Sequence, residues 1–461
     1  MKALRPVAAL MALATLPVMA SADEDVAALR AELQALKSEY GARVQSLETR
    51  IEKLETASQA TADAAALAPA PSPVEPAPAS SSGSASAFNP AMSLILGGTF
   101  TNTSRDPADW RIAGFAPAGD ESGPGERSFN LGESELTLSA SIDPYFSGVL
   151  TAAITADNEI AVEEAFFRTT SLRNGFSVKG GRFLSSVGYL NEVHAHAWDF
   201  TDQPLIYQAM FGGQLRQDGL QVKWLAPTDL FLELGAETGN GDAYPATRLE
   251  SNGFNGATLF AHVGGDIGDT TSWRAGASWL TQQAENRAGA PVDESGTTAF
   301  DSFTGDSETW VVDGVVKWKP SPRRELKVQA EYMRRSEDGT YVFDPAGLAA
   351  LTNYRNTQSG WYLQGVYQFA PRWRVGARYD SLDSGNALYT PAAIDPPIDF
   401  GLPLPALHPE RVSLMLDWSP SEFSRLRAQF DWDDARDDGE TDRILRLQYV
   451  YGLGAHGAHK Y

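Results

Sequence analysis

Alternation of apolar and polar side chains over segments of about ten residues constrains this chain more than any other feature. From Phe88 to Tyr461 the alternation recurs with the period of a β-strand whose two faces meet different surroundings. We predict sixteen such strands, at residues 91–101, 130–142, 145–155, 160–170, 175–183, 216–225, 229–238, 256–264, 271–282, 307–318, 325–336, 358–369, 372–382, 409–418, 422–433 and 442–454.

The connections between these strands alternate between very short and mostly long. The short ones are 142–145, 171–175, 226–229, 265–271, 319–325, 369–372 and 419–422, and the long ones include 102–129, 184–215, 239–255, 283–306, 337–357 and 383–408. An even number of strands, with short turns at one end and long loops at the other, is the plan of a bacterial outer-membrane barrel. The sequence therefore predicts an all-β fold, a 16-stranded antiparallel transmembrane β-barrel.

The two faces of these strands differ in a way that fits a membrane. One face is apolar and bounded by aromatic residues, as in Trp310, Val312, Val316 and Trp318, in Trp361, Leu363, Tyr367 and Phe369, and in Leu414, Leu416 and Trp418. The opposite face carries Asp313, Lys317, Tyr362, Gln364, Gln368, Arg411, Ser413 and Asp417. We expect the apolar face to lie against lipid and the polar face to line a wet lumen.

Three different segments precede the predicted barrel domain of residues 88–461. Residues 1–22 combine two basic residues, an apolar stretch and a small-residue cleavage signal, which is typical of a signal peptide, the alternative being a short buried helix. Residues 23–56 have a heptad seam, which predicts a self-associating coiled-coil helix or, alternatively, a lone amphipathic helix docked on the chain. Residues 57–87 are rich in Ala, Pro and Ser, which predicts an extended linker.

Charge and composition exclude several classes of function. Acidic residues outnumber basic ones by 59 to 37, and the net charge of −22 repels nucleic-acid phosphates. The chain has no cysteine, which excludes a disulfide scaffold, a thiolate nucleophile and an iron–sulfur cluster. We also find no strong nucleophile motif, phosphate loop or dinucleotide fingerprint. We therefore expect neither enzymatic activity nor a cofactor; a hydrolase with a Ser–His pair in the barrel wall is the alternative.

Basic residues are frequent at the inward positions of the strands. The last four strands place arginines on one stretch of wall, and earlier strands contribute Lys179, Lys223 and Arg274. Clustered guanidinium groups in a narrow pore attract anions. Alternatively, each arginine pairs with a neighbouring lumen carboxylate and stiffens the wall. The candidate pore-lining arginines are Arg374, Arg378, Arg411, Arg425 and Arg427.

The long connection 184–215 is the predicted constriction of the pore. It is more apolar than a solvated loop needs to be, so we expect it to fold inward against the wall. Glu192, Asp199 and Asp202 would then face the arginines across the lumen and create a transverse field. The alternative is an outer loop packed on its neighbours.

Two pairs of histidines are candidate metal ligands. On a strand, His194 and His196 would place both imidazoles on one face, and with Glu192 they could hold zinc or copper. His456 and His459 are a weaker candidate, because residues three apart point to opposite sides of a strand. No further ligand has a recognisable spacing from either pair.

The order of these parts resembles that of trimeric outer-membrane porins with an N-terminal coiled coil, of the phosphate-selective and dicarboxylate types. FNPAMSLILGGTF, GRFLSSVGYLNEVHAHAWDF, WLAPTDLFLELGAE and LDWSPSEFSRLR are similar to segments of a group of proteobacterial outer-membrane proteins, often labelled TonB-dependent or zinc-regulated receptors. Such receptors are barrels of about twenty-two strands with a folded plug inside. This chain instead offers sixteen strands, preceded by a helix and a spacer.

Together these features predict an outer-membrane porin of a Gram-negative bacterium that lets small polar, including anionic, solutes diffuse. We expect it to lie in outer-membrane lipid as a homotrimer, with no nucleic-acid partner, and with its N-terminal helix in the periplasm reaching toward the cell wall. Two alternatives stay open. One is a metal (zinc)-linked uptake receptor that uses His194 and His196, and the other is an envelope tether whose barrel is plugged.

Overall fold

The structure, a computed structural model, describes seven stretches of the chain, residues 90–116, 122–154, 159–247, 252–288, 302–343, 350–390 and 406–454. The chain divides into two compact units, Met1–Ser82 and Gly83–Tyr461, and the described residues belong to the second. The predicted signal peptide, coiled coil and linker lie outside the described residues, as do His456 and His459.

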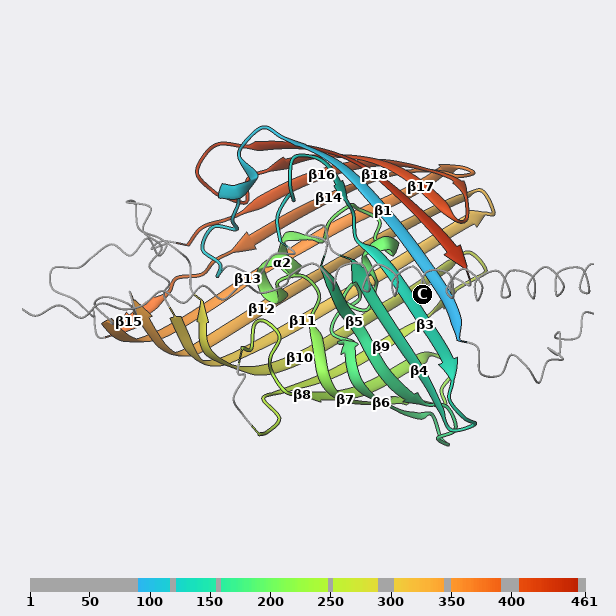
Figure 1. The fold of residues 1–461 in the computed structure, drawn as a ribbon, viewed down its shortest axis with the longest axis horizontal. Helices are drawn as coiled ribbons and strands as arrows, with labels where there is room; N and C mark the ends of the chain where they lie inside the picture. The colour runs from blue at the N-terminus through green and yellow to red at the C-terminus, as the bar shows by residue number, and fades with distance from the viewer. Residues whose placement is uncertain are drawn as a thin grey trace, which may run out of the picture. The chain divides into compact units, whose positions relative to one another are not determined.

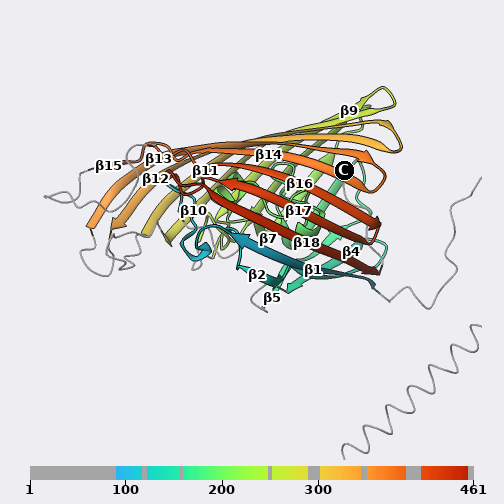
Figure 2. The same cartoon turned by 90° about the horizontal axis from the view of Figure 1, so that it is seen from above.

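One sheet contains all the strands of the described residues (Figures 1 and 2). They are β1 (Ala91–Thr103), β2 (Ser128–Leu131), β3 (Ser134–Ser141), β4 (Phe146–Ile154), β5 (Ile160–Thr169), β6 (Phe176–Leu184), β7 (Arg216–Leu225), β8 (Phe231–Gly239), β9 (Gly256–Ile267), β10 (Thr271–Ala288), β11 (Ser302–Ser321), β12 (Arg324–Phe343), β13 (Ala350–Ala370), β14 (Trp373–Asp383), β15 (Leu388–Thr390), β16 (Glu410–Ser421), β17 (Ser424–Asp433) and β18 (Asp442–Gly454).

The sheet closes into a barrel with sixteen positions in its wall. Neighbouring strands are antiparallel, and β1 pairs with β18, so the first strand meets the last. Of the eighteen strands, β2 and β3 both pair with β1 and share one position, and β14 and β15 both pair with β13 and share another. The predicted 16-stranded antiparallel barrel is confirmed. Pairing of the first strand with the last removes the two open edges that a flat sheet would have.

The strand boundaries differ from the prediction on one side of the barrel. β11 and β12 have 20 residues each and β13 has 21, far more than the predicted segments there. Their extra residues continue the hydrogen-bonded ladder beyond the apolar band, where Phe303, Tyr341 and Tyr354 form a buried cluster. The apolar alternation marks only the part of a strand that has an apolar outer face, so it underestimated these strands.

The two faces of the wall have the predicted composition. Trp310, Trp361 and Leu414 are exposed on the outside of the barrel, whereas Asp313, Tyr362 and Ser413, from the same three strands, are buried inside. The outer surface is therefore apolar, as a wall against hydrocarbon must be. Among the helices in the described part of the chain, none is long and apolar enough to span a membrane.

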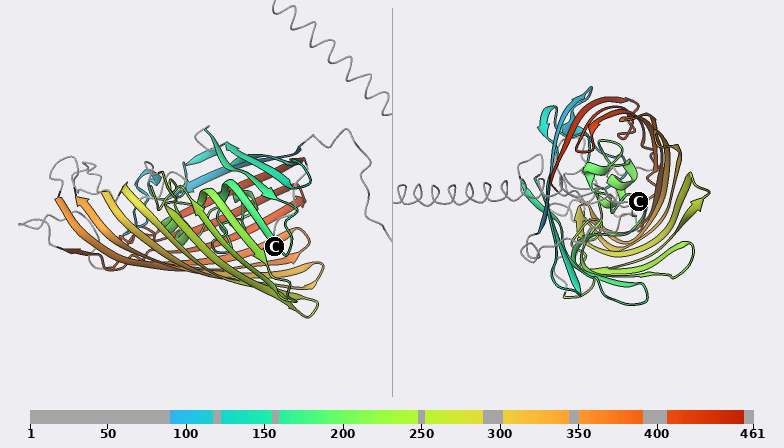
Figure 3. Two further views of the ribbon diagram at one scale, coloured as in Figure 1. Left: turned by 90° about the horizontal axis from the view of Figure 1, so that it is seen from below. Right: turned by 90° about the vertical axis from the view of Figure 1, so that its right-hand side faces the viewer.

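The connection from β6 to β7 lies inside the barrel, and we call residues 185–215 the inward segment. It contains a short 3₁₀ helix, η2 (Ala195–Ala197), and one α-helix, α2 (Leu205–Phe211). Every residue of α2 is buried, and the helix packs against β12, β13 and β14. Figure 3, right, shows α2 within the ring of strands. Gly212 ends the helix in the left-handed conformation, with a φ of 68°.

Candidate functional site

Buried carboxylates of the wall hold the inward segment by its backbone. Glu331 on β12 accepts hydrogen bonds from the amides of Tyr189 and Leu190, both at 3.0 Å. The same carboxylate accepts from the hydroxyls of Tyr207 at 2.8 Å and Tyr362 at 2.6 Å. Four donors therefore converge on one side chain that is 2% exposed. Backbone amides that leave water need such partners, so Glu331 fixes this part of the segment.

Two further carboxylates bind the segment, one at its first residues and one at the start of α2. Glu237 on β8 accepts from the hydroxyl of Ser185 at 2.5 Å and from the amide of Ser186 at 2.8 Å, just after β6 ends. Asp380 on β14 accepts from the amide of Leu205 at 2.9 Å, at the start of α2. The inward segment is thus attached to several strands along its length.

The predicted arginines contact the same segment from β14, β16 and β17. Arg378 on β14 donates to the Asp202 carboxylate at 2.9 Å, and Arg411 on β16 lies 3.0 Å from its second oxygen. Arg446 on β18 lies 3.4 Å from Asp202. Burial raises the pKa of Asp202, but Arg411, Arg446 and Arg378 outweigh it and hold the pKa well below its usual range. Asp202 is therefore an anion under a cluster of three guanidinium groups.

Asp199, three residues earlier in the inward segment, is also bound by basic side chains of the wall. It accepts from Arg374 at 2.8 Å and from Lys327 at 3.0 Å. Arg374 also donates to Asp417 on β16, at 3.1 Å through its Nε. Each of these charges therefore has an opposite charge in direct contact.

The last two predicted arginines bind backbone carbonyls of the segment. Arg425 donates to the carbonyl of His196 at 2.6 Å, and Arg427 donates to that of Trp198 at 2.8 Å. All five predicted arginines thus contact the inward segment. This corrects the predicted arrangement, because Asp199 and Asp202 touch the arginines directly instead of facing them across an open lumen. Arg378, Arg411 and Arg427 are at most 3% exposed, so they lie beneath the segment.

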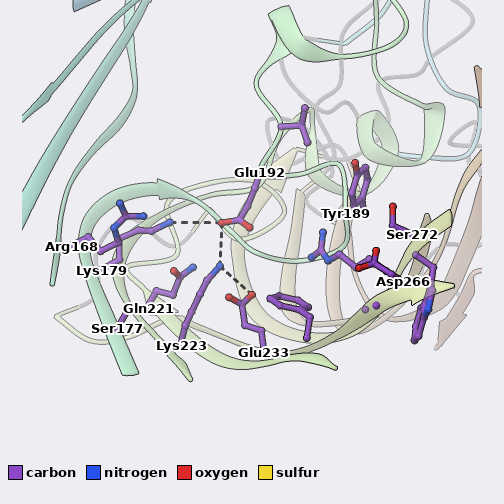
Figure 4. A pocket seen from close by; sticks show the side chains of 16 residues that line it. Arg168, Ser177, Lys179, Tyr189, Glu192, Gln221, Lys223, Glu233, Asp266 and Ser272 are labelled. Atoms are coloured by element: carbon purple, nitrogen blue, oxygen red, sulfur yellow. Dashed lines mark hydrogen bonds and ion pairs between the residues drawn. The ribbon is translucent and has the colours of Figure 1, made fainter. Parts of the chain in front are cut away.

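Glu192, the third predicted acid, lies elsewhere, at a cavity between the inward segment and the wall of β5 to β10. Its carboxylate is 3.4 Å from Lys223 and 3.8 Å from Lys179 (Figure 4). The cavity has a volume of about 560 Å³. Its charged lining consists of Arg168, Lys179, Lys223 and Arg274 against Glu192, Glu233 and Asp266.

The cavity lies toward the end of the barrel with the short turns. Asp266 and Ser272 line it from either side of the tight turn between β9 and β10. Tyr189 and Glu192 of the inward segment face this wall across the cavity (Figure 4). Inward alternation identified Lys179, Lys223 and Arg274 from the sequence, but nothing in the sequence showed that these residues line a cavity whereas Arg378, Arg411 and Arg427 are buried.

His194 and His196 lie among glutamates of the wall and not with Glu192. His194 Nδ1 is 3.2 Å from Glu135 on β3 and 3.3 Å from Glu163 on β5, and its Nε2 is 3.1 Å from Glu164. His196 Nδ1 is 2.7 Å from Glu135. Burial lowers the pKa of His194, but hydrogen bonds to Glu135, Glu163 and Glu164 outweigh it and raise the pKa well above its usual range. The predicted partner Glu192 is therefore replaced by three other carboxylates.

A β-bulge explains why the sequence did not reveal these partners. Thr151 on β4 pairs with Glu164 and Ala152 pairs with Val162, which leaves Glu163 without a partner in the ladder. Neighbouring residues of a regular strand point to opposite faces, but a bulge re-aims one of them. Both Glu163 and Glu164 therefore reach the same imidazole.

Comparison with known proteins gives one clear relative. No protein-family model matches the sequence. An uncharacterized protein of Aquifex aeolicus (strain VF5) is 32% identical over 398 residues, which are 81% of this chain and 80% of that protein. The chain belongs to the same family as this Aquifex protein. The relationship covers most of the barrel, but the relative has no described activity to transfer.

The fold of this chain is similar to that of solved outer-membrane proteins. OmpT of Vibrio cholerae with loop L8 deleted has a TM-score of 0.50 and 12% identity, and the match covers 79% of this chain and 99% of OmpT. The trimer form of in-vitro folded OmpT matches with the same TM-score, identity and coverage. At this identity the similarity shows the fold alone.

Proposed function

We propose that this protein is an outer-membrane channel through which small polar solutes diffuse along the wall of β5 to β10. The observation that supports this most directly is the charged cavity of about 560 Å³ between that wall and the inward segment. Buried ion pairs and an apolar helix fill the opposite side of the lumen. A solute would therefore pass Lys179, Lys223 and Glu192, and the inward segment would form the constriction.

The charges of the cavity indicate the class of solute. Four basic and three acidic side chains line it, so both signs are within reach of a passing solute, with one positive charge in excess. Tyr189 and Trp273 add aromatic surface. Such a lining suits small polar and zwitterionic molecules and gives a weak preference for anions.

The proposal also includes the membrane in which the protein lies and its oligomeric state. The apolar outer face suits the lipid of a Gram-negative outer membrane. We propose a homotrimer, in which the heptad seam of residues 23–56 holds three subunits together on the periplasmic side. One solved structure of OmpT with this fold is a trimer form.

Recordings of single channels in planar bilayers test this proposal. The purified full chain should insert and conduct in discrete steps, in groups of three for a trimer. Under a salt gradient, the reversal potential should show a weak anion preference. Absence of steps from protein that migrates as a folded barrel would contradict the channel.

Replacing Lys179 and Lys223 together by glutamine should turn this preference toward cations. The cavity would then carry two basic side chains against three acidic ones, so we expect the permeability ratio of chloride to potassium to fall by on the order of twofold or more. Arg355→Gln is the control, because the Arg355 side chain is 72% exposed on β13, a strand that does not line the cavity. An unchanged reversal potential in the double variant would place the ion path elsewhere.

A further inference from the structure

The histidines of the inward segment and the glutamates of β3 and β5 form a compact cluster of metal-ligating atoms. We propose that His194, Glu135 and Glu163 bind a divalent transition-metal ion between the wall and the inward segment. One ligand atom from each of these residues lies within 4.8 Å of the other two. This site is separate from the ion pairs of Asp199 and Asp202, and it does not depend on the channel function.

The spacing of the ligand atoms fits coordination around a single ion. His194 Nδ1 is 3.2 Å from an oxygen of Glu135 and 3.3 Å from an oxygen of Glu163. Nitrogen and oxygen ligands lie about 2.1 Å from zinc, so two of them on a tetrahedral ion are about 3.4 Å apart. An ion can therefore enter between these atoms with small shifts of the side chains. The remaining coordination positions would hold water.

The surrounding contacts are those that orient metal ligands. The other ring nitrogen of His194, Nε2, lies 3.1 Å from Glu164, which fixes the ring so that Nδ1 faces Glu135 and Glu163. Metal-bound histidines almost always donate their second ring N–H to such an acceptor. The second oxygen of Glu135 lies 2.7 Å from His196 Nδ1, which holds this carboxylate in place.

Charge and access also suit a cation. Glu135, Glu163 and Glu164 bring three carboxylates to one buried place, and a divalent ion would balance most of their charge. The His194 side chain is 22% exposed, and its neighbours Glu192 and Val193 line the cavity, which provides a path for entry. One imidazole with carboxylates selects ions such as zinc, manganese or cobalt over magnesium and calcium, which prefer oxygen ligands alone.

Binding of cobalt(II) and zinc to the purified full chain tests the site. All measurements use a background with His456→Ala and His459→Ala and no affinity tag, so that these two histidines contribute no ligand. We expect one Co²⁺ per chain by visible absorption, its displacement by Zn²⁺, and no displacement by excess Mg²⁺. His194→Ala and Glu163→Gln should each weaken Co²⁺ binding at least tenfold.

Glu192→Gln is the matched control, because it removes a carboxylate of the same segment that contacts Lys179 and Lys223 instead of the histidines. This variant should keep the Co²⁺ affinity of the background protein. Gel mobility before and after heating verifies that each variant is a folded barrel. Absence of stoichiometric Co²⁺ on the folded background protein would overturn the proposal and leave the cluster as ion pairs alone. Equal affinity in Glu163→Gln and Glu192→Gln would overturn it as well.

Discussion

Replacing Glu331 by alanine should release the inward segment from the wall and lower the stability of the folded barrel. The change leaves the amides of Tyr189 and Leu190 and the hydroxyls of Tyr207 and Tyr362 without their acceptor. Each buried donor left unpaired costs about 1–3 kcal/mol, so we expect the free energy of unfolding to fall by more than ~3 kcal/mol. Urea unfolding in detergent, followed by tryptophan fluorescence, measures this loss.

The control for Glu331 is a second buried carboxylate on the neighbouring strand. Asp313 on β11 is 4% exposed, and neither of its oxygens has a hydrogen-bond partner among the described residues. Asp313→Ala should therefore change the free energy of unfolding far less than Glu331→Ala. Equal losses in the two variants would show that the hydrogen bonds of Glu331 to the inward segment are unimportant for stability.

Replacing Asp202 by asparagine should have a comparable effect through charge. The side chain keeps its shape, but Arg378, Arg411 and Arg446 lose their shared carboxylate in a buried place. Each arginine keeps at least one other carboxylate, from Asp380, Asp433 or Asp431, so the change removes one charged partner from a buried network and costs about 1.5–3 kcal/mol. We expect a loss of this size in the free energy of unfolding and, as the segment loosens, a larger and noisier single-channel conductance.

An exposed ion pair of the same type serves as the control for Asp202. Asp338 and Arg355 lie 2.5 Å apart, with side chains 63% and 72% exposed. Exposed pairs contribute about 0–1 kcal/mol, so Asp338→Asn should leave both stability and conductance almost unchanged. The account of the arginine cluster would be wrong if Asp202→Asn were as mild as this control.

The wall of the barrel could be predicted from the sequence, because each strand contains its own information. Alternation of apolar and polar side chains predicts which residues face outward, and the order of short and long connections predicts how the strands are arranged. Trp310 and Ser413 accordingly lie on the predicted faces. Strand length was less certain, since β13 extends by polar residues whose pairing with β12 has no apolar signature.

The contents of the lumen could be predicted only in part. The apolar character of the connection 184–215 indicated that it would pack against other residues, and the inward positions of the arginines followed from alternation. Which acid meets which base depends on where the inward segment lies in three dimensions. Asp202 meets strands more than 170 residues away, as in its bond to Arg378. Glu192 instead contacts Lys179 and Lys223, and no local sequence pattern predicts this contact.

Thiol labelling of single cysteines tests most directly whether the open path runs along β5 to β10. The chain has no cysteine, so each substitution introduces the sole thiol. Ser177 and Ser272 line the cavity, whereas Ser413, on β16 beneath the inward segment, is fully buried. With a charged, water-soluble thiol reagent, Ser177→Cys and Ser272→Cys should react and lose conductance, and Ser413→Cys should do neither. Rapid reaction and block at Ser413→Cys, with none at Ser177→Cys, would contradict the account.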